Sequence, residues 1–262
     1  MIKALRTAAT GMEAQQMNVD TIANNLANVN TGGFKKSRIE FKDILYPKIK
    51  GAGGTTMGEA TSPTNLEVGF GTQPAATQRL FSQGNITPTG NALDLCIEGD
   101  GFFQINMPDG STAYTRDGAL KLSADGKIVT TDGFFLYPEI TIPSDATQIS
   151  IGVDGKVTVQ LVGANDPQEI GQLELVKFIN PAGLEAMGHN LFKQTSASGD
   201  PMIGTPTQEG LGKINQGALE LSNVEVVEEM VNMIIAQRAY EINSKAIQTS
   251  DDMSGIANNL KR

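Results

Sequence analysis

The sequence has few of the residues from which catalytic and metal sites are built. Its 262 residues include one histidine, one cysteine and no tryptophan, and aromatic residues make up 5% of the chain. Cys96 has no partner for an internal disulfide, and its place in a strand-like alternation predicts a buried structural residue. His189 lacks the second histidine or nearby cysteine that a zinc site would need. The low aromatic content predicts a core of modest stability.

Basic clusters and long apolar runs are also scarce. A net charge of −9 argues against a nucleic-acid partner, because phosphate binding requires clustered Lys and Arg. The one basic cluster, at 35–38, is interpreted as a solvated turn. The longest apolar stretch runs from Met230 to Ala236, is interrupted by Asn232 and is too short to span a bilayer. We therefore expect no direct membrane insertion, and the first residues show no cleavable secretory signal.

Motifs for catalysis or cofactor binding are not found. Each Asp-Gly dipeptide stands alone, without the spaced ligands and distal glutamate of a calcium loop. The glycines at 51–58 are not followed by the Gly-Lys-Ser/Thr of a phosphate-binding loop. We therefore predict no catalytic, cofactor-binding or metal-binding residues.

Both ends of the chain carry an apolar repeat of seven residues, which is typical of helices that pack against other helices. The stripes are narrow, so a coiled coil or a tube of helices fits better than a globular core, although a helical hairpin folded onto the monomer's own body is an alternative. The residues predicted to pack between subunits are Leu5, Met12, Val19, Ile22, Leu26, Val29, Ile235, Ala239, Ile242, Ala246, Met253, Ile256 and Leu260.

Local signals predict where these helices begin and end. The N-terminal helix should end near Asn28, before the glycines at 32–33, one of which can take a positive φ. Ser222 and Glu225 have the spacing of a capping box, which predicts that the C-terminal helix begins at Asn223. If it runs to about residue 258, that helix is about 54 Å long.

The middle of the chain is predicted to form short antiparallel strands. Asp-Gly recurs at residues 109, 117, 125, 132 and 154, which predicts a meander of hairpins with tight turns. One hairpin can be predicted to its register. A shared buried face requires Val153 opposite Val157 and Ile151 opposite Val159, with a three-residue loop at 154–156.

These patterns predict an α+β chain with an all-β domain inserted between two long terminal helices. Residues 1–33 and 209–262 should supply the inner helical domain, the latter with a return segment before its helix. Residues 81–208 should form the β-rich outer domain. Residues 34–80 should form an extended β-arm with a Gly-, Ala- and Thr-rich insertion at about 47–63, which an isolated subunit should leave mobile.

Two terminal segments and two internal motifs carry recognisable signatures. The internal motifs are Glu98-Gly-Asp-Gly-Phe-Phe and Tyr114-Thr-Arg-Asp-Gly. The residues of the terminal signatures are Asn24, Asn25, Leu26, Ala27, Asn28, Gly33, Phe34, Gln237, Arg238, Ala239, Tyr240 and Glu241. Together they resemble the signatures of the bacterial flagellar rod and hook axial proteins. Chain length and the segment from Tyr46 to Asn85 are most similar to the distal rod members.

The resemblance implies a structural subunit of the distal rod, in the periplasm-spanning part of the flagellar basal body. Subunits would stack helically into a hollow drive shaft that transmits torque from motor to hook and encloses the export channel. The implied partners are further copies of the chain, the proximal rod proteins, the hook protein, the peptidoglycan- and outer-membrane-ring bushings and the flagellar export apparatus. Export would need no cleaved signal.

Three alternatives remain open at this point. The chain could be a proximal-rod or hook paralogue of the same family. A secreted translocator or adhesin could also use terminal coiled coils. An enzyme acting on peptidoglycan would need a carboxylate of raised pKa, for which Glu98 and Asp100 are the candidates.

Overall fold

The computed structural model describes residues 2–50, 65–163 and 166–259, and the chain divides into two compact units. The helical unit takes its described residues from 2–26, 37–78 and 225–259. The β unit takes them from 27–36 and 79–224. The predicted α+β class, with a helix at each end and short antiparallel strands between them, is confirmed.

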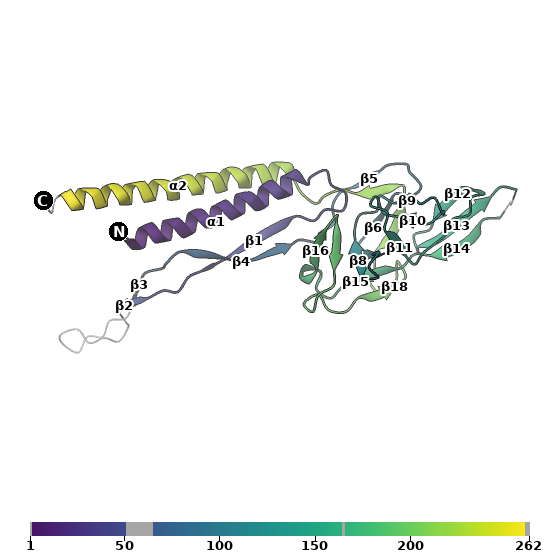
Figure 1. The fold of residues 1–262 in the computed structure, drawn as a ribbon, viewed down its shortest axis with the longest axis horizontal. Helices are drawn as coiled ribbons and strands as arrows, with labels where there is room; N and C mark the ends of the chain where they lie inside the picture. Colours follow the sequence, from purple (N-terminus) through teal and green to yellow (C-terminus); the bar gives the residue numbers. More distant parts are fainter. Residues whose placement is uncertain (1, 51–64, 164–165, 260–262) are drawn as a thin grey trace. The chain divides into compact units, whose positions relative to one another are not determined.

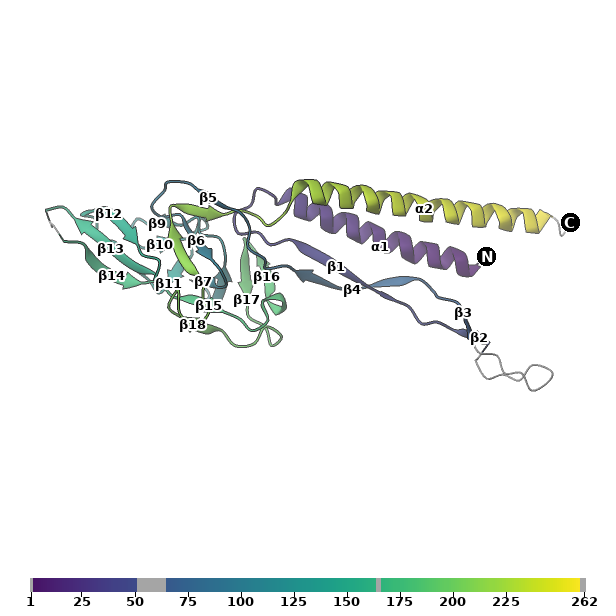
Figure 2. The same ribbon diagram turned by 180° about the vertical axis from the view of Figure 1, so that it is seen from behind.

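The helical unit contains two helices and a β-arm. The helices are α1 (Ile2–Ala27) and α2 (Val226–Asn259), which lie side by side in both views (Figures 1 and 2). In the arm, β1 (Ser37–Asp43) pairs with β4 (Thr72–Arg79), and β2 (Lys48–Lys50) pairs with β3 (Leu66–Glu67). The strand β2 lies within the insertion predicted at about 47–63, and residues 51–63 of that insertion lie outside the described residues.

The arm packs on α1 at its Gly69–Gly71 turn. A Cβ atom added to Gly71 would lie 2.0 Å from Thr10 Oγ1, and Gly71 has a φ of +104°. The guanidinium of Arg6 lies 5.5 Å from the centroid of the Phe70 ring, a cation–π contact. Glycine at 71 therefore lets the arm approach the helix closely.

The predicted start of the C-terminal helix is wrong by three residues, since α2 begins at Val226 and not at Asn223. The Ser222 hydroxyl accepts a hydrogen bond from the N–H of Val224 at 3.3 Å, so it forms a local turn and not the first half of a capping box with Glu225. The first helical bond is accepted by the Glu225 carbonyl, from Glu229 N–H. The N-terminal helix ends within one residue of its predicted end.

The β unit is built from short strands in several sheets. In its largest sheet the order is β16-β17-β8-β7-β11-β10-β9, with β15 also paired to β7 and β18 paired to β15. A three-stranded sheet has the order β12-β13-β14, and two further pairs are β19 with β6 and β20 with β5. The return segment at 209–224, grouped above with the C-terminal helix, contributes β19 and β20 to this unit. The strands are β5 (Ile86–Pro88), β6 (Leu95–Glu98), β7 (Phe102–Asn106), β8 (Thr112–Thr115), β9 (Lys121–Leu122), β10 (Ile128–Val129), β11 (Phe135–Tyr137), β12 (Ala146–Ile151), β13 (Lys156–Leu161), β14 (Gln168–Gln172), β15 (Leu175–Lys177), β16 (Glu185–Gly188), β17 (Leu191–Lys193), β18 (Met202–Gly204), β19 (Lys213–Gln216) and β20 (Ala218–Glu220).

Two hydrophobic clusters form the core of the β unit. The larger is aliphatic and includes Leu95, Ile105 and Val157. The smaller is aromatic, and in it Phe102 makes edge-to-face contacts with Phe178 at 5.9 Å between ring centroids. A short 3-10 helix, η1 (Pro181–Gly183), follows β15 beside this second cluster.

Four of the five predicted Asp-Gly turns are confirmed, and they share one hydrogen-bond pattern. In each, the glycine has a positive φ and its N–H donates to the carbonyl three residues earlier. Asp117-Gly118 is the exception, and the prediction of a hairpin turn there is wrong. A Cβ atom on Gly118 would lie 1.6 Å from Leu95 O, so this glycine is required by the close approach of two backbones. The four turning glycines are Gly110, Gly126, Gly133 and Gly155.

The predicted register of the β12–β13 hairpin is wrong, because the partner of each residue lies two positions away from the one predicted. Ile151 pairs with Val157, and Ile149 pairs with Val159. The cause is the turn from Gly152 to Gly155, which takes Val153 out of the strand and leaves it exposed. Side chains two positions apart lie on the same face of a strand, so this shift of two residues leaves the buried apolar face as predicted.

Candidate subunit interface

The two helices of the helical unit contact each other through polar and small side chains. Near the start of α2, Asn25 Nδ2 donates to Glu229 Oε2 at 3.2 Å, and both side chains are buried. Further along, a Cβ atom added to Gly11 would lie 2.8 Å from Asn243 Nδ2. From the first contact to the second, the residue number falls by fourteen on α1, from 25 to 11, and rises by fourteen on α2, from 229 to 243. The helices therefore run antiparallel in constant register.

Asn25 also connects the end of α1 to the start of the arm. Its Nδ2 donates to Ser37 O at 2.9 Å, and its Oδ1 accepts from Ser37 N at 2.9 Å. This paired interaction satisfies the side-chain amide in a buried position. The signature position Asn25 is therefore occupied by a residue that holds α1, α2 and β1 together within the helical unit.

The face of α2 toward α1 repeats every seven residues, but it is not the apolar stripe identified in the sequence. Its buried residues are Glu229, Ala236 and Ser250, in step with Asn243. Ile235 and Ile242 are 61% and 67% exposed. The helical hairpin therefore forms through a different face, and α1 leaves the apolar stripe of α2 uncovered.

The other predicted helix residues fall into three groups. Met253 and Ile256 are exposed with the stripe, Ala246 is exposed, and Ala239 is half-buried. On the N-terminal side Ile22 is buried within the chain, while the half-buried residues are Leu5, Met12, Val19, Leu26 and Val29. Leu260 lies outside the described residues.

Most of the C-terminal signature lines a groove between α1 and α2. The groove has a volume of about 490 Å³ and is lined by Gln16, Val19, Gln237, Tyr240 and Glu241. Val19 and Tyr240 supply its apolar lining, and the Glu241 carboxylate in it is paired with Arg238 at 3.0 Å. Such a groove between two helices is suited to the side chains of a third.

A second arrangement, in the β unit, is a cluster of buried charges that the sequence reasoning missed. Lys35 Nζ contacts Glu220 Oε1 at 2.6 Å, and the two side chains are 0% and 1% exposed. Arg116 Nε contacts Glu220 Oε2 at 3.1 Å. The interpretation of the 35–38 cluster as a solvated turn is therefore wrong at Lys35. Isolated charges in apolar segments, such as Glu220 in β20, were the available signal.

Every charge in this cluster has further hydrogen bonds. Lys35 Nζ donates to Ser82 O at 2.8 Å, and Gly84 N donates to Glu220 Oε1 at 2.9 Å. Arg116 Nη1 donates to the carbonyls of Gly99 and Gly101, at 2.7 and 2.8 Å. The cluster thus joins five separate segments of the chain, which lie between residues 35 and 220.

The cluster holds two cations and one anion, and the pKa values reflect this imbalance. Burial alone would raise the pKa of Glu220, but Arg116 and Lys35 outweigh it and hold the pKa below its usual value. Burial lowers the pKa of Lys35, and the neighbouring Arg116 acts in the same direction against the opposing effect of Glu220. The two cations therefore stabilise the charged form of Glu220. The charged form of Lys35 is disfavoured by burial, and the neighbouring Glu220 is what offsets this effect.

The segment after α1 is fixed beside this cluster by its glycine and by Asn223. Gly33 has a φ of +66°, and a Cβ atom on it would lie 2.7 Å from Asp117 N. Lys36 N donates to Asn223 Oδ1 at 2.7 Å, and Asn223 Nδ2 donates to Leu80 O at 2.8 Å. Asn223 was expected to be the first residue of a helix. Its side chain instead connects its own segment to those of Lys36 and Leu80.

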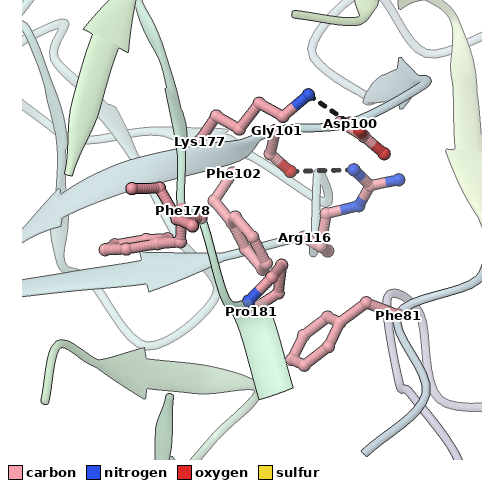
Figure 3. Close-up of a pocket in the computed structure, with 9 residues that line it drawn as sticks. Phe81, Asp100, Gly101, Phe102, Arg116, Lys177, Phe178 and Pro181 are labelled. Atoms are coloured by element: carbon pink, nitrogen blue, oxygen red, sulfur yellow. Dashed lines mark hydrogen bonds and ion pairs between the residues drawn. The ribbon is translucent and has the colours of Figure 1, made fainter. Parts of the chain in front are cut away.

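Next to Arg116 lies a cavity of about 160 Å³ with aromatic walls. Figure 3 shows the rings of Phe81, Phe102 and Pro181 on the side opposite to the Lys177–Asp100 ion pair, with Arg116 between them. Lys177 Nζ and Asp100 Oδ2 are 2.9 Å apart. Ile179 also lines the cavity and is 80% exposed, which places it at the opening. Hydrogen bonds of Arg116 to the described residues involve its Nε and Nη1, which leaves Nη2 for an occupant.

The two carboxylates considered for catalysis do not have the properties of a general acid. A hydrogen bond from Asn215 and a contact with Lys213 hold the pKa of exposed Glu98 below its usual value, the opposite of the required direction. Asp100 is exposed and paired with Lys177. No group of three metal-ligating side chains occurs in the part of the chain that the structure describes.

The single cysteine and the single histidine lie in structural positions. Cys96 is fully buried in β6, and burial raises the pKa of its thiol to about 11, so it is unreactive near neutral pH. His189 lies in the exposed turn between β16 and β17, with its Nδ1 3.3 Å from Asp132 Oδ2. Neither helix, as far as it is described, is long and apolar enough to cross a membrane.

Comparison with protein families gives three matches along the chain. Residues 5–35 match the family described as "Flagella basal body rod protein". Residues 96–159 match "Flagellar hook protein FlgE/F/G D1 domain", and residues 215–260 match "Flagellar basal body rod FlgEFG protein C-terminal". These segments include the helices, the Asn25 contact and the Arg116 region described above.

Full-length relatives carry the same description. "Flagellar basal-body rod protein FlgG" of Borreliella burgdorferi is 54% identical over 264 residues, and the protein of the same name in Bacillus subtilis is 41% identical over 268 residues, each covering 100% of both chains. "Flagellar hook-basal body complex protein FlhP" of Bacillus subtilis is 30% identical over 278 residues, again over 100% of both chains.

Proposed function

The chain belongs to the family of flagellar basal-body rod proteins and is a structural subunit of that rod, and on this premise we propose that it forms the distal rod. Its copies polymerise helically into a hollow drive shaft that transmits torque to the hook and encloses the protein-export channel. The higher identity to relatives named as rod protein FlgG than to the hook-basal body complex protein supports this choice over a paralogue. The family is a structural one and not an enzyme family.

The observation that carries the proposal is the uncovered apolar stripe of α2. Ile235, Ile242, Met253 and Ile256 are exposed on a helix whose seam with α1 is formed by small and polar residues. Exposed apolar surface of this extent marks an interaction site. Helices of neighbouring copies cover the stripe and line the inner wall of the shaft, in the manner of a coiled coil.

The β units form the outer shell of the shaft in this proposal. They face the ring bushings in the peptidoglycan and the outer membrane, while the ends of the shaft contact the proximal rod proteins and the hook protein. The subunit belongs to the basal body, and we propose that it reaches the growing end through the flagellar export apparatus without a cleaved signal. The insertion at about 47–63 bridges subunits and stiffens the shaft. A secreted translocator or adhesin, the other class considered, would be favoured by a lipid-insertable apolar helix or a receptor-facing domain, and neither described helix is long and apolar enough to cross a membrane.

Polymerisation of the purified protein tests this function. Electron microscopy should show a hollow filament with its helices inside. Replacing Ile235 and Ile242 by Ser should raise the critical concentration for polymerisation at least about tenfold per residue, because each buried aliphatic side chain contributes about 1.5–3 kcal/mol. The monomer's melting temperature should not change, since both side chains are exposed in it.

Val162→Ser is the matched control, because Val162 is an exposed apolar residue of the β unit. It removes a similar amount of exposed apolar surface without touching the stripe. A double variant at Ile235 and Ile242 that polymerises as well as this control would contradict the proposal, as would a solid or non-helical aggregate.

A further inference from the structure

The cavity beside Arg116 has the features of a built binding site. One wall is apolar, formed by aromatic rings and Pro181, and its volume of about 160 Å³ is that of a cavity which accommodates a benzene-sized group. The opposite wall carries the guanidinium of Arg116, which is buried and has Nη2 available. An occupant that fits must therefore present an apolar side chain and a hydrogen-bond acceptor together.

The charges around the cavity favour an anionic acceptor. Lys35, Arg116 and Lys177 are cations, whereas Glu220 and Asp100 are the carboxylates paired with them. These contacts leave one positive charge in excess beside an apolar cavity, where water screens it poorly. A carboxylate from outside would neutralise that charge.

The arm of the helical unit carries such a combination. Leu45 is 79% exposed, and Asp43, two residues earlier, is also exposed. The ion pairs among the described residues do not involve Asp43. Between Asp43 and Leu45, Ile44 N donates to the carbonyl of Gly71, the residue before β4, at 3.0 Å, so the two flank a residue that is held in the arm.

We propose that this cavity receives Leu45 of a second copy of the chain, with the carboxylate of Asp43 directed to Arg116 and Lys177. The inference rests on the proposed polymer, in which one surface of each copy meets a different surface of the next. A contact between unlike surfaces continues along a filament when the rotation from one copy to the next does not close into a ring. The cavity is then a socket, and the arm of the neighbouring copy fills it.

Cysteine crosslinking tests the contact in the filament. One variant carries Leu45→Cys and a second carries Ile179→Cys, at the opening of the cavity. The buried thiol of Cys96 does not interfere. Filaments grown from a mixture of both variants and treated with a short bifunctional maleimide should give a covalent dimer, and the unpolymerised mixture should not.

Leu66→Cys is the matched control for Leu45→Cys, since Leu66 is an exposed leucine in β3, on the opposite strand of the same arm. Mixed with Ile179→Cys, it should give at least about tenfold less dimer. Filaments of the correct mixture without a dimer would overturn the proposal while leaving the proposed function intact. A crosslink that forms within one chain of the doubly substituted protein would also overturn it, because the occupant would then be the copy's own arm.

Critical concentrations give a second measurement that does not depend on crosslinking. Leu45→Ala should raise the critical concentration at least about tenfold and Asp43→Asn several-fold, with unchanged melting temperatures. Leu66→Ala, at another exposed residue of the arm, should change it less than about twofold. Equal values for Leu45→Ala and Leu66→Ala would refute the assignment. If the wild-type chain forms no filament, the proposed function fails first and this inference with it.

Discussion

Glu220→Gln should destabilise the β unit more than any surface substitution. The change keeps the shape of the side chain but removes the negative charge that Lys35 and Arg116 share at 2.6 and 3.1 Å. Both cations remain buried, and removing one partner of a buried ion pair costs about 3–5 kcal/mol. At about 2–4 °C per kcal/mol for a chain of this size, the melting temperature should fall by roughly 10 °C.

The structure supplies a matched control for this experiment. Lys127 and Glu139 form an ion pair with the same distance of 2.6 Å, but both side chains reach solvent. Glu139→Gln should leave the melting temperature nearly unchanged, because water screens an exposed pair. Calorimetry or circular dichroism of the unfolding transition measures both variants under identical conditions.

A double substitution separates the charge effect from packing. Lys35→Met in the Glu220→Gln background removes one of the two uncompensated cations and should recover most of the lost stability. The two changes should therefore be strongly non-additive in a double-mutant cycle. The reasoning is refuted if Glu220→Gln costs no more than Glu139→Gln, or if the effects of the two buried substitutions simply add.

The ion pairs of Glu220 with Lys35 and Arg116 also predict how the stability of the folded protein depends on pH. The pKa of Glu220 is lower in the folded protein than in the unfolded chain, where it is about 4.3. Its contribution is therefore fully present above that value and is lost as the pH falls through the lower folded pKa. The difference in melting temperature between wild type and Glu220→Gln should narrow below about pH 4, whereas a constant difference would contradict the assignment.

Three further predictions follow from single features. Gly118→Ala should destabilise more than Gly110→Ala in thermal unfolding, because a Cβ on Gly118 meets Leu95 O at 1.6 Å whereas Gly110 has open space around it and costs only about 1 kcal/mol for its φ of +80°. Cys96 should not react with a thiol reagent at pH 8 until the protein is unfolded, since its pKa is about 11, and rapid labelling of the native chain would disprove this. Helical circular dichroism should increase on polymerisation, because α2 has only Glu229, Ala236 and Ser250 buried among its described residues, and an unchanged signal would show that the helices need no neighbours.

Features set by local chemistry were predicted well from the sequence. The end of α1 was predicted within one residue, because the glycines after it permit the positive φ seen at Gly33. The four Asp-Gly turns follow from the same property of glycine. The seven-residue repeat predicted a helix at each end of the chain, and both helices are present, while the packing of Ile235 and Ile242 between subunits stays a prediction.

Features set by distant contacts were missed. The start of α2 was misplaced because Asn223 and Ser222 look like capping residues, but the Asn223 side chain binds Lys36 and Leu80 instead. Lys35 and Glu220 are 185 residues apart, and their residue types are normally exposed, so no local pattern predicts that they meet in a dry interior. The helix seam was missed because a row of Glu, Ala, Asn and Ser does not read as an interface.

Glu220 lies close to the end of the β unit in sequence, so its charge cluster forms only when nearly all of that unit's chain is present. A chain released before this residue would leave Lys35 and Arg116 facing each other without a counter-charge, and the segment after α1 would lose the carbonyl of Glu220 that accepts from Gly33 N at 2.8 Å. A chain truncated before residue 220 should therefore fail to close its β unit, because two buried cations would lack their carboxylate.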